Sequence, residues 1–345
     1  MRGDNSTTYK KNRPQVVKTV KGVVKIASYG GAALILQRDG KVFTTGYNSS
    51  GQLGIGSTKY KKSPVKVTIS CVIDIAAGRT SSYALKKDGT VWAWGYNADE
   101  ELNIGNAWPA LKPKKVLGLS NISKIWAGED NFVAQDKLGN LFALGYNFDG
   151  QLGIGTNEAP ASYPAQLGNL GFKSLSIAGS TVTAIETSTS SIKIWGDSTY
   201  AVPNYLGSSN SLPQDLPFGN NWKTVVLGWG HALAVDTDNS LWAWGSNQNG
   251  AVGAHLGTYC TISETQNNEC GGWDYFTGLY FKVVDSPVML LPNVVAMAAG
   301  QDFSLALKTD GTVWAWGDGG EGQLGNGYNY DSDKPSKVMS INLNK

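Results

Sequence analysis

The sequence has only two histidines and three cysteines among its 345 residues, which leaves few side chains for metal-ion or nucleophilic chemistry. It also contains no HExxH pattern, no CxxC pattern and no Walker-type phosphate loop. We therefore expect no bound metal ion, no cofactor and no catalytic residue. The chain is interpreted as a protein that acts without enzymatic chemistry of its own.

Charged residues and long apolar runs are scarce as well. Asp, Glu, Lys and Arg make up 16% of the chain, whereas glycine is abundant, with 43 residues. Helical proteins need Lys and Glu on their wet faces and avoid Gly, so this composition predicts a turn-rich β protein. No apolar run approaches the roughly 18 to 20 residues of a membrane-spanning helix. The first ten residues lack the apolar stretch of a secretion signal, so neither membrane insertion nor Sec-type export is expected.

The three cysteines allow two separate expectations. Cys71 lies in an alternating apolar run and is interpreted as a small buried hydrophobic residue. Cys260 and Cys270 bracket a polar stretch that includes two asparagines, and they could pair as a disulfide. The redox state of the compartment decides between the bridged and the free form, so both stay open.

One short pattern, an aromatic or apolar strand that ends in glycine, recurs six times along the chain. The terminal glycines are Gly46, Gly95, Gly145, Gly196, Gly245 and Gly317. Their spacing is about 50 residues, with one insertion before the last copy. Several copies follow an Asp-Gly pair such as Asp39-Gly40, which predicts a hairpin with a type I′ turn. With a strand ending in a small-residue turn and a Pro-led strand further upstream, each repeat contains four short strands.

Four-stranded antiparallel units at this period predict an all-β protein, a β-propeller with six blades. Seven blades are possible, because a Pro-led strand occurs at both ends of the chain, at residues 14–17 and 335–338. Residues 1–13 are expected to form a basic mobile tail and residues 14–345 a single propeller domain. The paired indoles of the repeats are expected to pack between blades as structural core. These are Trp92, Trp94, Trp242, Trp244, Trp314 and Trp316.

The repeat pattern D-G-x-V-W-x-W-G-x-N-x-x-G-Q-L-G resembles that of the regulator of chromosome condensation family. It is carried best by residues 47–56, 146–155 and 318–327, and the resemblance extends from about residue 14 to residue 338. The resemblance implies a propeller fold and a member of bacterial or bacteriophage type. The family includes a nucleotide-exchange factor for a small GTPase, secreted bacterial enzyme inhibitors and phage repeat proteins, so the fold does not select one function. Family repeats often carry a His after the small-residue turn, which this chain keeps only at His231.

Basic residues are concentrated at the N-terminal end of the chain. Residues 1–66 contain 13 Lys and Arg against two acidic residues, and the remainder contains 16 basic against 25 acidic residues. This asymmetry predicts either a solvated face with a mobile tail or a docking surface for a protein partner with an acidic surface. Lys10, Lys11 and Arg13 are the candidate contacts in the tail. Nucleic acid is not expected as a partner, because the aromatic residues are assigned to the core.

The insertion at about residues 255–284 is the second candidate for a specific contact, because it holds five aromatic residues close together in sequence. They are Trp273, Tyr275, Phe276, Tyr280 and Phe281. Loops on a rigid scaffold commonly carry function, and exposed aromatics are typical binding anchors. The alternative is a hairpin that packs on its own propeller face.

These observations favour a non-enzymatic propeller that presents loops for protein or glycan contact. A composition suited to extracellular exposure, without an export signal, is consistent with a bacteriophage virion component attached to a tail, neck or capsid. Its partners would then be virion proteins or a host-surface receptor or glycan. Outside a virion, the protein would be cytoplasmic or would leave the cell by a route other than Sec. The alternatives are a guanine-nucleotide exchange factor for a small GTPase and a secreted enzyme inhibitor.

Overall fold

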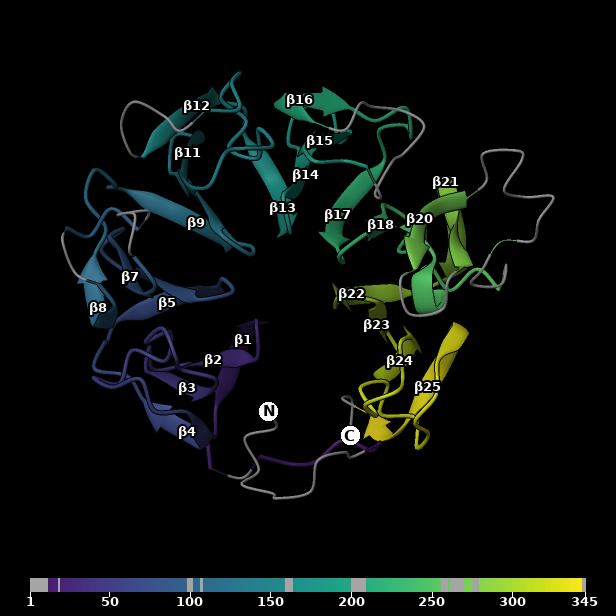
Figure 1. Ribbon diagram of the computed structural model, residues 1–345, viewed down its shortest axis with the longest axis horizontal. Coiled ribbons are helices and arrows are strands. Elements are labelled where there is room, and N and C mark those ends of the chain that lie inside the picture. Colours follow the sequence, from purple (N-terminus) through teal and green to yellow (C-terminus); the bar gives the residue numbers. More distant parts are fainter. Residues whose placement is uncertain are drawn as a thin grey trace. The chain divides into compact units, whose positions relative to one another are not determined.

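Each sequence repeat folds into short antiparallel strands, as the alternating apolar pattern and the frequent glycine turns predict. The computed structural model describes residues 12–17, 19–97, 102–105, 108–158, 164–199, 209–255, 260, 270–274 and 279–342. Within these ranges the chain forms 25 strands and one 3-10 helix, η1 (Gln248–Gly250). The strands are grouped into six antiparallel sheets, labelled in Figure 1.

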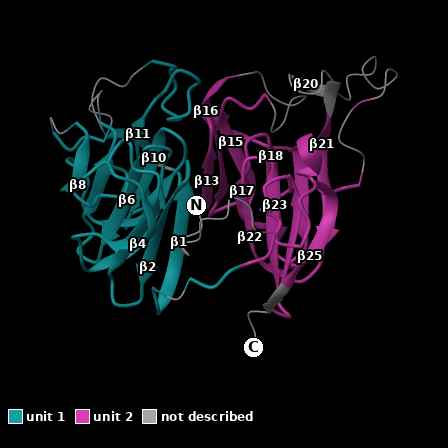
Figure 2. Ribbon diagram, turned by 60° about the horizontal axis from the view of Figure 1, so that its bottom comes forward, with its two compact units in different colours: residues 1–7, 15–171 teal, residues 8–14, 172–345 magenta. Residues whose placement is uncertain are grey.

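The chain divides into two compact units, coloured separately in Figure 2. Unit 1 runs from Gln15 to Gly171 and contains three four-stranded sheets. The first is β1 (Val23–Tyr29), β2 (Ala32–Gln37), β3 (Val42–Gly46) and β4 (Lys61–Lys66). The second is β5 (Val72–Ala77), β6 (Ser81–Lys86), β7 (Val91–Gly95) and β8 (Ala110–Lys115). The third is β9 (Ile122–Ala127), β10 (Asn131–Asp136), β11 (Asn140–Gly145) and β12 (Ala165–Asn169).

Unit 2 contains the other three sheets and the N-terminal residues 12–14. The fourth sheet is β13 (Phe172–Ala178), β14 (Thr181–Glu186), β15 (Ile192–Gly196) and β16 (Asn210–Asp215). The fifth is β17 (Trp222–Leu227), β18 (His231–Asp236), β19 (Leu241–Ser246) and β21 (Leu279–Leu291), with β20 (Cys270–Asp274) added beyond β21. The sixth is β22 (Val294–Ala299), β23 (Phe303–Lys308), β24 (Thr312–Gly317) and β25 (Ser332–Asn342).

Within each unit the sheets pack face to face. The first strand of a sheet contacts the first two strands of the sheet before it, as β5 contacts β1 and β2, and β17 contacts β13 and β14. Large buried side chains fill these contacts, because each sheet has an apolar pattern on both faces. The six antiparallel sheets, five with four strands and one with a fifth strand added, confirm the predicted β-propeller with six blades.

The Pro-led strand of each repeat belongs to the blade before it. Val65 on β4 pairs with Thr44 on β3, and Ser336 on β25 pairs with Ala315 on β24. The C-terminal Pro-led strand therefore completes the sixth blade, and the N-terminal copy at residues 14–17 forms no strand. Strand pairing depends on which edges meet in space, so the sequence pattern left the choice between six and seven blades open.

Residues at the end of the predicted tail are fixed to the sixth blade. The backbone N–H of Gly327 donates to the carbonyl of Asn12 at 2.7 Å, and Nδ2 of Asn12 donates to the carbonyl of Gly327 at 2.7 Å. Pro14 lies beside Gly325 in the same loop. Residues 1–11 of the predicted tail, including Lys10 and Lys11, lie outside the described residues.

Two local predictions were wrong in detail. The hairpin at Asp39-Gly40 forms, but only Gly40 has a positive φ (79°), and its N–H donates to the carbonyl of Gln37 at 3.0 Å. This is a type I turn followed by a left-handed glycine, because a type I′ turn needs positive φ at both central residues. Cys71 is exposed and has a positive φ of 58°. Asn121, at the matching position before β9, has a similar φ of 55°. Cys71 lies in a turn and not in a buried strand.

Candidate functional site

The second aromatic residue of most repeats is committed to the core. Trp94, Trp195, Trp244 and Trp316 are all fully buried. In unit 1, Nε1 of Trp94 donates to the carbonyl of Gln52 in the preceding blade at 2.9 Å, and Oγ of Ser82 donates to the same carbonyl at 2.8 Å. In unit 2, Nε1 of Trp316 donates to the carbonyl of Ala251 at 2.9 Å. The indoles of Trp94 and Trp316 thus connect neighbouring blades, and none of the four is exposed to a ligand.

The first aromatic residue of most repeats is less buried than the second. Trp92, Trp242 and Trp314 are only partly buried. Nζ of Lys86 lies 5.3 Å from the ring centroid of Trp92, and Nε1 of Trp242 donates to Asp236 at 2.8 Å. The six indoles predicted as core thus form two groups, three fully buried and three that pair with a polar side chain of the adjacent strand.

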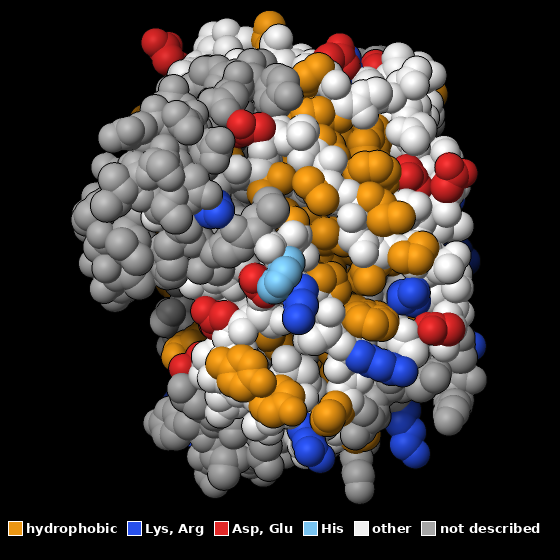
Figure 3. Space-filling model, turned by 90° about the vertical axis from the view of Figure 1, so that its right-hand side faces the viewer, with side chains coloured by type: hydrophobic (Ala, Val, Ile, Leu, Met, Phe, Trp, Pro, Cys, Tyr) orange, Lys and Arg blue, Asp and Glu red, His pale blue; other side chains and the backbone are white. Residues whose placement is uncertain are grey.

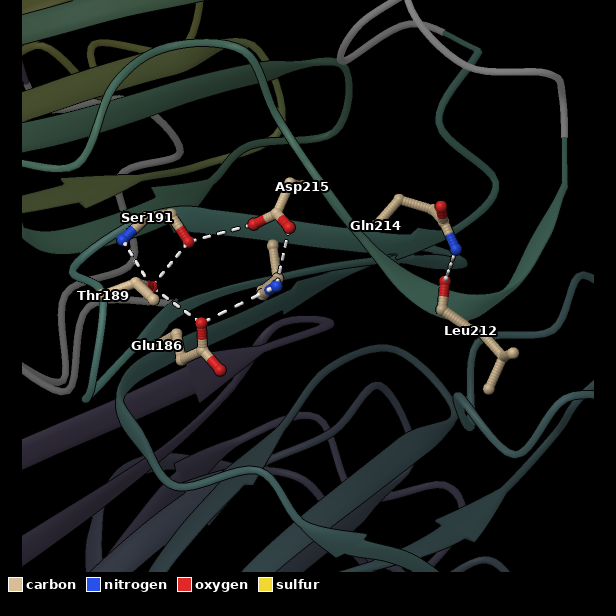
Figure 4. A network of polar contacts seen from close by, with 7 residues as sticks. Glu186, Thr189, Ser191, Leu212, Gln214 and Asp215 are labelled. Atoms are coloured by element: carbon tan, nitrogen blue, oxygen red, sulfur yellow. Dashed lines mark hydrogen bonds and ion pairs between the residues drawn. The ribbon is translucent and has the colours of Figure 1, made fainter.

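In the fourth blade Lys193 replaces the first aromatic residue of the repeat, and a polar network replaces the indole contact (Figure 4). Nζ of Lys193 lies 2.8 Å from Oδ2 of Asp215 and 3.7 Å from Oε2 of Glu186. Thr189 donates to Glu186 at 2.7 Å, and Ser191 donates to Asp215 at 3.0 Å. The hydrogen bond from Lys193 lowers the pKa of Asp215, in spite of its partial desolvation. The charges are paired with one another, so the network is interpreted as structural.

A buried asparagine organises the long loop of most blades. Oδ1 of Asn48 accepts the N–H of Leu53 at 2.9 Å, and its Nδ2 donates to the carbonyls of Ser57 and Lys59 at 2.7 and 3.0 Å. Oδ1 accepts the matching loop N–H at Asn97, Asn147 and Asn247. Each of these residues stands at the asparagine position of the repeat pattern, which by itself indicates no role for the side chain. They hold the loops in defined conformations.

His231 is a core residue as well. Its side chain is 1% exposed, and Nε2 lies 2.9 Å from Oγ of Ser304 in the next blade of unit 2. Burial lowers the pKa of His231 to about 4, so the imidazole is neutral at pH 7. Ser304 in turn donates to the carbonyl of Ala251 at 2.9 Å. The histidine position of this repeat therefore serves contacts between blades.

The turn between the first two strands of a blade and the loop after its third strand lie on one side of the blade, here called the loop face. Ala32 at the start of β2 pairs with Gly46 at the end of β3, so the β1–β2 turn and the loop after β3 open on the same side. In unit 1 this face carries Tyr47 (57% exposed), Tyr146 (39%) and Phe148 (75%). The rings of Tyr146 and Phe148 lie 5.9 Å apart.

Ion pairs tie neighbouring turns of the loop face together in unit 1. Nη2 of Arg79 lies 2.5 Å from Oδ2 of Asp130, and its Nε lies 3.2 Å from Oε1 of Glu129. The hydrogen bond to Asp130 raises the pKa of Arg79, which stays charged. The backbone N–H of Arg79 also donates to the carbonyl of Glu129 at 2.8 Å. The turns of the second and third blades are thereby fixed against each other.

Unit 2 also exposes aromatic and hydrophobic side chains. Trp229 is 57% exposed in the β17–β18 turn, and the rings of Tyr328 and Tyr330 lie 5.0 Å apart in the loop after β24. Figure 3 shows hydrophobic side chains running along one side of the molecule; exposed hydrophobic residues of the outer strands of unit 2 include Met289 and Met339. Aromatic residues thus accompany the long loops in both units.

The predicted site residues are only partly within the described chain. Tyr275 and Phe276, like Lys10 and Lys11, lie outside it, and Arg13 lies in the segment held by the sixth blade. Trp273 on β20 pairs with Tyr280 on β21, and Phe281 follows on β21, so the backbone of the insertion forms a hairpin that extends the fifth blade. Cys260 and Cys270 form a disulfide, with their Cα atoms 6.1 Å apart.

Two kinds of feature are absent from the part of the chain that the structure describes. No group of three or more His, Cys, Asp or Glu side chains is arranged to hold a metal ion. No helix among these residues is long and apolar enough to cross a membrane.

Two models of the regulator of chromosome condensation (RCC1) repeat match this chain, and together they cover more than half of it. One matches residues 39–85, 88–134 and 310–345, and the other matches residues 23–52, 72–100, 222–251 and 294–323. The chain belongs to the RCC1 repeat family. The matched segments begin and end within the structural repeats, so the family pattern and the six blades describe the same periodicity.

Several known proteins are similar to this RCC1-repeat chain over part of its length. It is 25% identical to the human E3 ubiquitin-protein ligase HERC2 over 54% of this chain and 4% of that protein. It is 31% identical to the ultraviolet-B receptor UVR8 of Arabidopsis thaliana over 42% of this chain and 29% of that protein. The chain therefore spans less than a third of the length of these curated relatives.

Solved structures share the fold over nearly the whole chain. Human WBSCR16 has a TM-score of 0.76 at 19% identity, covering 92% of this chain and 81% of that one. Yeast RCC1 (Prp20), solved bound to Kap60, has a TM-score of 0.78 at 21% identity, covering 95% and 78%. The protein is an RCC1-like propeller.

Proposed function

We propose that this protein is a non-enzymatic module that binds another protein through its loop face. The observation that carries the proposal is that buried and exposed side chains occupy different positions of the repeat. Side chains that most repeats share serve internal contacts, as Trp94 and Asn48 do, while other aromatic side chains at the loops are exposed. Exposed aromatic residues on a rigid scaffold are typical anchors of protein interfaces.

The third blade shows how such an anchor is prepared. Phe148 is 75% exposed beside Tyr146, at the start of a loop that Asn147 holds. Nδ2 of Asn147 donates to the carbonyls of Thr156 and Glu158 at 2.8 and 2.7 Å. A loop that is already ordered loses little conformational entropy on binding, so the aromatic contact retains more of its favourable free energy.

The relatives support protein as the class of partner. Yeast RCC1 (Prp20) was solved bound to Kap60, and a second structure of Prp20p was described together with its binding properties to Gsp1p and histones. We carry over to this chain only the class of partner. A partner with an acidic surface, a virion component and a contact through the aromatic insertion stay predictions from the sequence.

Site-specific photo-crosslinking tests the loop face directly. A photoreactive phenylalanine analogue is placed at Phe148 or at Leu138, which is 78% exposed in the turn at the opposite end of β11. Each protein is irradiated in lysate of the source cells, and the adducts are identified by mass spectrometry. We expect one discrete protein adduct from position 148 that is absent from position 138. Adducts of equal yield at both positions, or none at position 148, would contradict the proposal.

The alternative functions rest on the family resemblance. Accelerated nucleotide release from a small GTPase by catalytic amounts of this protein would support an exchange factor. His231, the one histidine kept at the family position, lies in the core and offers no surface contact for that activity. Inhibition of a hydrolase, abolished by deleting residues 273–281, would instead support a secreted inhibitor.

A further inference from the structure

The outer strands of the first two blades are unusually rich in lysine. We call the lysines of these two strands, together with Lys59, the lysine rim. It consists of Lys59, Lys61, Lys62, Lys66, Lys112, Lys114 and Lys115. Two exposed aromatics precede the strands, Tyr60 (47% exposed) and Trp108 (65%). By contrast, β12 and β16 contain no lysine and β25 contains two.

The lysine rim is not neutralised by the residues that the structure describes. None of its seven lysines forms an ion pair with a described carboxylate, whereas Lys25, Arg79 and Lys193 all do. The sequence has no Asp or Glu between Asp39 and Asp74, or between Glu101 and Glu129. Residues 99–101, an acidic run of the second blade, lie outside the described residues. The rim is therefore a concentrated positive surface on a chain whose net charge is only +2.

Protection of sheet edges does not explain this concentration. Lysine and proline on an edge strand prevent unwanted strand pairing. Proline is present in the outer strands of the first, second, fourth, fifth and sixth blades, at Pro64, Pro113, Pro213, Pro287 and Pro335. Most blades manage their edges with few lysines, so the excess in two neighbouring blades requires a different cause.

The two halves of the rim belong to one fixed surface. The backbone N–H of Gly56, in the loop that leads to β4, donates to the carbonyl of Leu111 on β8 at 2.8 Å. Oγ1 of Thr45 donates to the carbonyl of Lys61 at 2.9 Å, and Asn48 holds the carbonyl of Lys59. The backbone that carries these lysines is therefore ordered before any partner arrives.

We propose that the lysine rim is a docking surface for an acidic, extended segment of a protein partner. Alternate residues of an extended chain lie about 6.8 Å apart on one side, and Lys112 and Lys114 have the same spacing on β8. Carboxylates along such a segment would face the rim lysines in register. Pro64 and Pro113 lack an N–H, which disfavours addition of a new strand and leaves recognition to side chains. This surface differs from the loop face and goes beyond the function proposed above.

Charge distribution favours an acidic protein segment over nucleic acid. Outside the seven rim lysines the chain contains 22 basic and 27 acidic residues, so a long polyanion that extends beyond the rim would meet repulsion. A short acidic segment that is confined to the rim would not. Tyr60 and Trp108 provide apolar contact at the ends of the strands.

The test uses the full chain and two labelled probes, an oligoglutamate of about 12 residues, long enough to span both strands, and an oligothymidylate of the same length. Binding is measured by fluorescence anisotropy at increasing salt. K62A/K66A removes two exposed lysines of the rim. K334A/K337A removes two lysines from the outer strand of the sixth blade and serves as the matched control.

We expect the wild-type protein to bind oligoglutamate, with an affinity that falls as salt rises. K62A/K66A should bind about fivefold more weakly, while K334A/K337A should bind like wild type. Equal losses in both variants, or no binding by the wild type, would overturn the proposal. Tighter binding of oligothymidylate that K62A/K66A removes would overturn it too, because the rim would then bind nucleic acid. Photo-crosslinking from position 148 in K62A/K66A reports separately on the loop face.

Discussion

The indole N–H of Trp94 donates to the backbone carbonyl of Gln52 over 2.9 Å, although 42 residues separate them in sequence. The same indole lies against Gly54, where an added Cβ would come within 2.7 Å of Nε1. Gly253 and Trp316 repeat this relationship in unit 2, with a closest approach of 2.5 Å. The glycine-bounded loop of one blade, G-Q-L-G at residues 51–54 and G-A-V-G at residues 250–253, therefore forms a single joint with the tryptophan of the next blade.

Gly54→Ala tests this joint. The new methyl group would overlap the Trp94 ring, and the φ of 66° adds backbone strain, so we expect a loss of about 3 kcal/mol in the free energy of unfolding. Gly105→Ala is the matched control, because Gly105 has a φ of 75° and no atom within 4 Å of its added Cβ. It should cost only about 1 kcal/mol. Urea unfolding of both variants measures the difference, and equal losses would exclude the steric explanation.

His231 predicts a specific pH dependence of stability. Burial lowers its pKa in the folded protein from 6.5 to about 4, so the unfolded chain binds the proton first as the pH falls. The contribution of the neutral His231 to the free energy of unfolding is complete above pH 6.5. About 3 kcal/mol of it is lost as the pH falls from 6.5 to 4. Thermal unfolding midpoints across this range measure the loss.

His231→Phe provides the control for the pH experiment. Phe303 occupies the same position in the sixth blade, beside Gly300, as His231 lies beside Gly228, so a phenyl ring suits this environment. The variant loses the contact with Ser304 and is expected to be less stable at pH 7. Its stability should nevertheless change less between pH 6.5 and pH 4. A variant with the full wild-type slope would show that other groups control it.

The fourth blade allows one cross-strand pair of side chains to be exchanged for another. Glu186 and Lys193 occupy the positions of Lys86 and Trp92 in the second blade, where the ammonium lies 5.3 Å from the indole centroid. E186K places a second cation beside Lys193, and K193W leaves Glu186 without its ion partner. Each single variant should lose about 1 kcal/mol. The double variant E186K/K193W should recover at least half of the summed loss in a double-mutant cycle, and strict additivity would show that the positions do not interact.

Two truncations separate the tail from the segment that the sixth blade holds. Removal of residues 1–11 leaves both hydrogen bonds between Asn12 and Gly327 intact, so the free energy of unfolding should be nearly unchanged. Removal of residues 1–14 eliminates both bonds and the contact of Pro14 with Gly325, which should cost about 2 kcal/mol. Faster hydrogen exchange of the Gly327 amide in the longer truncation alone would show that the lost stability comes from these contacts. Equal stability of the two truncated proteins would contradict a structural role for residues 12–14.

Local patterns predicted the strands, the hairpins and the number of repeats, because alternation and glycine turns act within a few residues. The sequence could not show that Val65 pairs with Thr44, which assigns the Pro-led strand to the preceding blade. Nor did the apolar neighbours of Cys71 reveal its left-handed turn. Both features depend on how separate segments meet.

The candidate surfaces were predicted less completely. Sequence composition drew attention to the N-terminal basic residues and to the insertion, but it treated the aromatics of the repeats as core. The structure distinguishes Trp94, which is fully buried, from Phe148, which is 75% exposed. The N-terminal excess of basic residues included only the part of the lysine rim on and just before β4, and the paired K-K patterns on the two outer strands β4 and β8 were an unused signal.

By itself, the sequence determined a β-propeller built from six copies of one unit, because the repeated alternation, turns and indoles specify the same local structure each time. Only the tertiary structure decided which copies of a residue type are buried, paired or exposed. Burial and charge pairing are properties of side chains brought together from different repeats. Trp92 and Trp94 lie on the same strand, yet the first is partly buried and the second is fully buried once the sheets pack.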